Sequence, residues 1–175
     1  ELAKAGQTQQ ALQIFDKAFN AAGSISDDYD SDDSAKADTL NFIAVELAKA
    51  GQTQQALQIF DKAFNAAGSI SDDYDSDDSA KADTLINIAW GLAKAGQFNK
   101  AINVAGFIHD NSKKAEALRY IASELAKAGQ FDDALNVAGS ISDDSYKAWV
   151  LRDIVVELTE AGQFNKAVTV AGSIS

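Results

Sequence analysis

The chain has 175 residues, of which 46% are hydrophobic and 23% charged, a composition that excludes disorder for most of its length. Its net charge is −11, and it contains no cysteine, which excludes disulfide bonds and thiolate metal sites. The sequence has no basic cluster with interleaved aromatic residues and no apolar run near the ~18 residues of a membrane span. We therefore expect neither a nucleic-acid partner nor a membrane partner.

One sequence unit recurs along the whole chain. The tripeptide Ala-Gly-Gln marks it at spacings of 45, 45, 33 and 33 residues, through Gly6, Gly51, Gly96, Gly129 and Gly162. Units repeated at such periods stack into an extended array. We expect a single repeat domain over 1–175, with units at 1–34 (incomplete), 35–79 (long), 80–111, 112–144 and 145–175. Because the chain begins within a unit and without Met, we also expect a fragment of a larger protein.

Each unit is predicted to be a pair of helices. The first helix of the unit at 35–79 covers 35–50 and has apolar residues at the i, i+3, i+4, i+7 spacing of one buried stripe, namely Leu40, Ile43, Ala44 and Leu47. Gly51 is predicted to end it. The second helix begins near Thr53 and places Ala56, Ile59, Phe60 and Ala63 on one side. No segment alternates with period two, so the predicted fold class is all-α.

The two unit lengths differ mainly inside the second helix. Between Ala-Gly-Gln and the later Ala-Gly-Ser-Ile, the long unit has seven residues more than the short one. Seven residues make about two helical turns, so the longer helix keeps the same face toward its neighbours. We expect a long second helix in the first units and short ones after residues 95–105.

In this register the chain resembles the tetratricopeptide-repeat family. Ala44 stands at the small position of that family's first helix, and Ala56, Phe60 and Ala63 stand at the A…F…A positions of its second. The chain lacks the family's closing proline and Trp/Tyr signature, and its periods depart from 34. The resemblance covers nearly the whole chain and implies a right-handed α-solenoid of about five stacked antiparallel helix hairpins.

The near-identical units differ at a few positions of the first helix. Residues 1–45 match 46–90 at 42 of 45 positions, and the differences are Asn41/Ile86, Phe42/Asn87 and Val45/Trp90. Positions 41 and 45 share one helical face, beside the buried stripe. In the family that this chain resembles, that face lines a concave groove for peptides. The expected partner-binding residues are therefore Asn41, Val45, Ile86, Trp90, Arg119, Ser123, Arg152 and Val156.

These side chains suit a protein or peptide partner with apolar and acidic groups, because apolar anchors would lie beside two guanidinium groups. A second interpretation stays open. The unit at 80–111 is the first with a short second helix, and Trp90 would then be a packing residue at that junction.

Two acidic segments, at 27–33 and 72–78, contain ten of the 26 acidic residues, and without these ten the net charge would be −1. Each begins like a Ca²⁺ loop, with alternate carboxylates at Asp28, Asp30 and Asp32 and at Asp73, Asp75 and Asp77. The glycine expected sixth is Asp33, and the glutamate expected twelfth is Thr39. We therefore favour solvated acidic loops over a metal site.

The sequence also lacks the residues that catalysis needs. His109 is the only histidine, and it occupies a turn position that the next unit fills with Ser142. Neither a cysteine nucleophile nor a glycine-rich phosphate loop is present. We expect no enzymatic activity and no cofactor. The main hypothesis is a protein- or peptide-binding scaffold; the alternative is head-to-tail self-assembly into a filament, because incomplete terminal units expose apolar hairpin faces.

Overall fold

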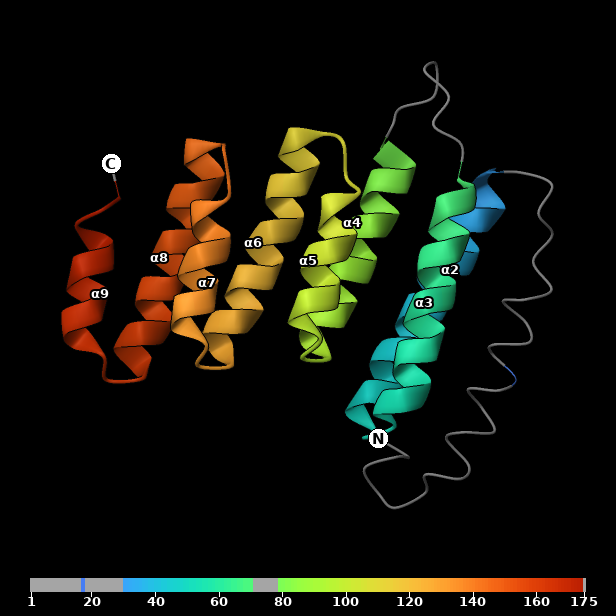
Figure 1. Ribbon diagram of the computed structural model, residues 1–175, viewed down its shortest axis with the longest axis horizontal. Helices are drawn as coiled ribbons and strands as arrows, with labels where there is room; N and C mark the ends of the chain where they lie inside the picture. The colour runs from blue at the N-terminus through green and yellow to red at the C-terminus, as the bar shows by residue number, and fades with distance from the viewer. Residues whose placement is uncertain (1–16, 18–29, 71–78, 175) are drawn as a thin grey trace.

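The computed structural model describes residue 17 and the ranges 30–70 and 79–174. The described residues form eight labelled helices and contain no β-strand, which confirms the all-α fold class for this part of the chain (Figure 1). None of these helices combines the length and the hydropathy that a membrane crossing requires. The helices are α2 (Asp30–Lys49), α3 (Thr53–Ser69), α4 (Ser79–Lys94), α5 (Phe98–Gly106), α6 (Asn111–Lys127), α7 (Phe131–Gly139), α8 (Asp144–Glu160) and α9 (Phe164–Ala171).

The helices form two sets. Helices α2, α4, α6 and α8 pack on one another in chain order, and we call them the A layer. Helices α3, α5, α7 and α9 are the B helices: each packs on the A helix before it, and α3, α5 and α7 also contact the A helix after it. Figure 1 shows the hairpins following one another along the longest axis of the molecule. Helix α3 has 17 residues, whereas α5 and α7 have nine and α9 eight, in line with the predicted change of length.

The glycine of the repeated tripeptide ends every A helix. At the four described copies its φ lies between 72° and 78°, the left-handed region that only glycine adopts without strain. After α2, the amide of Gly51 donates to the carbonyl of Ala48 and that of Gln52 to Leu47, both at 2.9 Å. These bonds satisfy carbonyls that a helix end leaves open. The predicted role of this glycine is confirmed.

Aspartates cap the A helices of the short units. The carboxylate of Asp110 accepts a hydrogen bond from the amide of Lys113 at 2.7 Å, and that of Asp143 accepts one from Tyr146 at 2.9 Å. Each cap satisfies an amide of the first helical turn, which has no partner within the helix. His109 precedes the first of these caps and is exposed, as expected for a turn residue.

Helix α2 begins earlier than predicted. The sequence pattern places its start at residue 35, but the helix begins at Asp30, so 30–33 are helical rather than part of an acidic loop. The first turn contains no apolar residue, so the helical period of apolar residues does not reveal it. The hydroxyl groups of Ser34 and Thr84 also lie 3.0 Å apart, so this end of α2 is joined to α4.

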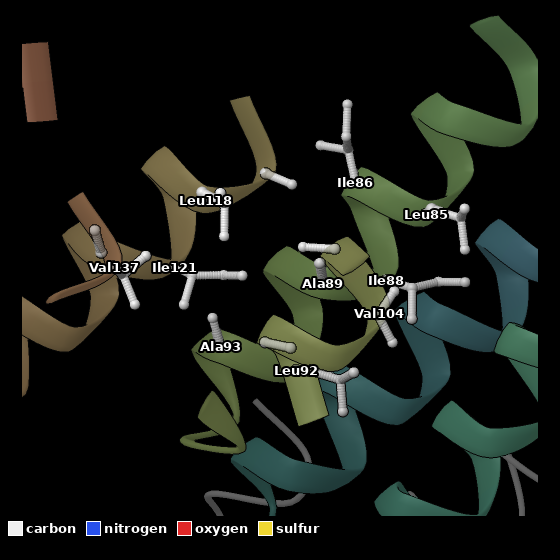
Figure 2. Close-up of a cluster of buried hydrophobic side chains, with 14 of the residues drawn as sticks. Leu85, Ile86, Ile88, Ala89, Leu92, Ala93, Val104, Leu118, Ile121 and Val137 are labelled. Carbon is white, nitrogen blue, oxygen red and sulfur yellow. The ribbon is translucent and has the colours of Figure 1, made fainter. Parts of the chain in front are cut away.

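The predicted apolar stripes form the core. All four residues of the α2 stripe are buried, and their equivalents in α4 are Leu85, Ile88, Ala89 and Leu92. Figure 2 shows this α4 stripe beside Val104 of α5 and Ile121 of α6. An alanine stands at the same place in α2, α4 and α6, as Ala44, Ala89 and Ala122, and each is fully buried. Such small residues let the helices approach closely at native packing density.

Candidate binding surface

The A helices share one face that the B helices do not cover. Its residues lie at positions 38, 42, 45 and 49 of α2 and at the equivalent positions of α4, α6 and α8, and none of them is buried. The spacing i, i+4, i+7, i+11 puts them on the side of each helix opposite the buried stripe. We call this surface the open face. It consists of Asp38, Phe42, Val45 and Lys49 in α2, Asp83, Asn87, Trp90 and Lys94 in α4, Glu116, Tyr120, Ser123 and Lys127 in α6, and Trp149, Asp153, Val156 and Glu160 in α8.

Of the partner-binding residues expected from the sequence, some lie on the open face and others lie at the contacts between A helices. Val45, Trp90, Ser123 and Val156 lie on the open face, whereas Asn41 and Ile86 are buried. The side-chain amide of Asn41 donates to the carbonyl of Asn87 in α4 at 3.0 Å, so this residue holds two A helices together. At the equivalent position in the later A helices, Arg119 of α6 is half-buried and Arg152 of α8 is exposed. The open face therefore includes position 45 of the predicted residues but not position 41, whose side chain is covered in α2 and α4.

An aromatic pair connects α4 and α6 on the open face. The ring centroids of Trp90 and Tyr120 are 6.1 Å apart at an interplanar angle of 46°, and Trp90 remains 39% exposed. Its described ring partner belongs to α6, not to the short helix α5 of the junction interpretation. Aromatic pairs at this distance attract one another beyond their shared apolar area.

Two cations lie over the rings of this pair. The Nζ atom of Lys94 is 4.2 Å from the ring centroid of Trp90, and the Cζ atom of Arg119 is 4.7 Å from that of Tyr120. Both distances are within the range of cation–π attraction. We call Lys94, Trp90, Tyr120 and Arg119 the cation–aromatic row. The spacing arguments of the sequence identified Trp90 and Arg119; Tyr120 and Lys94 become apparent only from the contacts.

Neither cation of the row has a carboxylate partner among the described residues. The described ion pairs instead involve Lys49, Lys100, Lys113, Lys127, Arg152 and Lys166. The Nε atom of Arg119 is buried and has no hydrogen-bond partner. A buried donor without a partner is unfavourable, so this Nε atom costs free energy and is not itself accessible to a partner.

The residue one turn before Lys94 is Gly91, which explains why Lys94 has no carboxylate partner among the described residues. In α2 and α6 the equivalent residue is a glutamate, and Glu46 and Glu124 pair with the lysines three residues later, Lys49 and Lys127. In α4 a side chain would not fit: a Cβ on Gly91 would overlap Oδ1 of Asn41 and lie 3.0 Å from Val45 Cγ2 and 3.1 Å from Phe60 Cε1. Close packing of α2 and α3 on α4 thus removes the acid that would neutralise Lys94.

The opposite edge of the open face is acidic, but its carboxylates have partners. The amide of Asn87 donates to Asp38 at 3.1 Å, the hydroxyl of Tyr120 donates to Glu116 at 3.3 Å, and Lys113 pairs with Asp83. The hydrogen bond to Asp83 raises the pKa of Lys113 above its ordinary value, against the opposing effect of partial burial. Among the charged side chains of the open face in α2, α4 and α6, Lys94 is therefore the one without an oppositely charged or hydrogen-bonded partner among the described residues.

Helix α8 contributes a second aromatic contact. Tyr146 and Trp149 pack edge to face with centroids 5.5 Å apart, and Trp149 is exposed at the position that carries an acidic residue in α2, α4 and α6. Phe42 of α2 is likewise exposed. Aromatic side chains thus occur on the open face from α2 to α8, and Phe42, Tyr120 and Trp149 are not among the partner-binding residues expected from the sequence.

The candidate Ca²⁺ ligands fall largely outside the described residues. This applies to Asp28, Asp73, Asp75 and Asp77, and for Asp30 and Asp32 only the helical backbone is described. Within the described ranges, no group of three or more histidine and carboxylate side chains is placed to hold a metal ion.

Comparison with protein-family models, curated proteins and solved structures finds no match for this chain. The resemblance to tetratricopeptide repeats therefore rests on the residues quoted above.

Proposed function

We propose that the chain is a non-catalytic scaffold that binds a protein or peptide on the open face, and that its hairpins stack as a right-handed, tetratricopeptide-like α-solenoid. Two features support this. The A helices follow one another from α2 to α8 without interruption, and the B helices pack on them while the open face stays accessible. A stack of this kind converts chain length into a continuous surface for an elongated partner.

The Trp90–Tyr120 pair is the observation that carries the proposal. Tryptophan, tyrosine and arginine are the residues that most often dominate binding energy at interfaces, and here a Trp–Tyr pair on the open face adjoins the half-buried Arg119. Aromatic rings have few rotatable bonds, so they supply contact area at a small cost in conformational entropy. Trp90 is also one of only three positions that differ between the two near-identical units.

A selection experiment tests the proposal. Phage-displayed random peptides are selected on the immobilised full chain, and the affinities of the enriched peptides are measured by titration. We expect Trp90→Ala to weaken binding by about thirtyfold or more, because it removes a central aromatic anchor. Phe164→Ala, an exposed aromatic on α9, is the matched control and should leave the affinity unchanged. Peptides that bind the Trp90→Ala protein as tightly as the wild type would exclude the open face as the site.

One observation favours self-assembly as a second function. Outside the open face, the last described hairpin exposes two large apolar side chains, Phe164 and Val168 of α9. Phe164 is 63% exposed, whereas its equivalent Phe131 is 7% exposed in α7, which α8 contacts. The face that one hairpin offers to the next is thus open at α9. A second copy of the chain could cover it in a head-to-tail row.

Sedimentation velocity over a range of protein concentrations separates the two functions. Self-assembly predicts a mass that grows with concentration, and Phe164→Lys combined with Val168→Lys should abolish the growth, because it places two charges on the contact. Trp90→Ala should leave this growth unchanged. A monomer at every concentration would rule out the second function.

A further inference from the structure

We infer that the segment bound on the open face is acidic, with a carboxylate at Lys94 and an apolar side chain on the rings of Trp90 and Tyr120. This inference deepens the proposed function and rests on it. It names the partner's chemistry from the charges that the row leaves without partners.

Lys94 differs from its equivalents in what surrounds it. Lys49 and Lys127 each pair with a glutamate one turn earlier, whereas the residue one turn before Lys94 is Gly91. The ammonium group of Lys94 lies over the indole of Trp90 and is exposed. The charge of this ammonium group is therefore available to a carboxylate from a partner. The indole ring beneath the ammonium group restricts its position, so the lysine side chain loses less entropy on binding.

Arg119 supplies a second cation at the other end of the row. Its guanidinium stacks on Tyr120, and its Nε donor is buried without a partner. A planar guanidinium binds carboxylates through two parallel hydrogen bonds, which fixes their orientation. The positive charge of Arg119 next to Tyr120 therefore adds to that of Lys94 and favours an acidic segment over a basic one.

The net charge of −11 does not oppose such a partner. Ten of the acidic residues belong to the segments at 27–33 and 72–78, and without them the charge would be −1. The rest of the chain is thus nearly neutral, and the two cations of the row have no carboxylate partner among the described residues.

The test compares a lysine of the open face, Lys94, with a lysine outside it. Acidic peptides enriched in the selection described above are titrated against the full chain with Trp149→Phe, so that Trp90 is the only tryptophan reporting fluorescence. We expect Lys94→Gln to weaken binding by about threefold to tenfold, and the affinity to fall as salt is raised. Lys100→Gln is the control and should change the affinity by less than about twofold, because Lys100 lies on the B helix α5, outside the open face, and already pairs with Asp61.

The possible outcomes distinguish the inference from the proposed function. Enriched peptides that are rich in Asp or Glu together with Trp, Phe or Leu, and that bind the Lys94→Gln protein more weakly, support both. Enriched peptides that are neutral or basic, depend on Trp90 and are insensitive to Lys94→Gln overturn the acidic partner but keep the open face as a binding site. If no peptide depends on Trp90, both proposals are wrong.

Discussion

Replacing Phe60 with alanine is expected to lower the free energy of unfolding by about 3–5 kcal/mol. Phe60 is 1% exposed, belongs to α3 and reaches the backbone of α4 at Gly91. Its ring therefore fills the place where the long B helix meets the next A helix. Removing it eliminates apolar contacts and leaves a cavity that rigid helices close only in part. Urea unfolding followed by far-UV circular dichroism measures the effect.

Phe42→Ala is the control for this prediction. Phe42 is the same residue type one helix earlier, but it is 65% exposed on the open face. Its replacement should change the unfolding free energy by less than about 0.5 kcal/mol, as is usual for surface substitutions. Equal losses for the two variants would show that Phe60 does not form part of the core.

The helices and their buried stripes could be predicted because each depends on local chemistry. A period of 3.6 identified Leu40, Ile43 and Leu47 as core residues, and one glycine per unit identified the helix ends. These features need no knowledge of the neighbouring hairpin. The early start of α2 was missed because its first turn contains no apolar residue, and the helical period is the signal that the prediction used.

The open face was harder to predict because it depends on how neighbouring A helices pack. A shift of one residue turns a side chain by about 100° around the helix, so a small error in the assumed contact direction moves a row from solvent to an interface. Asn41 illustrates this: it lies beside the buried stripe as expected, yet it is covered by α4 and bonded to Asn87. Trp90, which is equivalent to Val45 and therefore four residues later in the repeat, remains accessible.

Explaining why Lys94 has no carboxylate partner among the described residues requires both the repeat sequence and the packing of the A helices. The sequence shows that α4 alone has glycine where Glu46, Glu124 and Glu157 stand in the other A helices. It does not show why, since the reason is the approach of Asn41 and Val45 from another helix. The same glycine therefore links the packing of the scaffold to the charge of its open face.

This close approach makes a second large effect predictable: Gly91→Ala should destabilise the protein by about 1–3 kcal/mol, although alanine favours helices. The added methyl group would overlap the side chain of Asn41, which can move, but it would also press on Val45 and Phe60, which are packed against the core. Separating α2 from α4 would then weaken the hydrogen bond from Asn41 to Asn87. Urea unfolding of the variant and the wild type measures the loss.

Gly68→Ala should change the free energy of unfolding in the opposite direction. Gly68 lies in α3, is exposed, and has no heavy atom within 4 Å of the position that a Cβ would take. The substitution there should stabilise the protein by about 0.5–1 kcal/mol, because alanine loses less backbone entropy than glycine in a helix. Combining Asn41→Ala with Gly91→Ala should recover part of the loss at Gly91, since it removes the nearest of the three contacts. If Gly91→Ala instead stabilises the protein as Gly68→Ala does, α2 and α4 are not in close contact at this residue, and the explanation for the unpaired Lys94 fails with it.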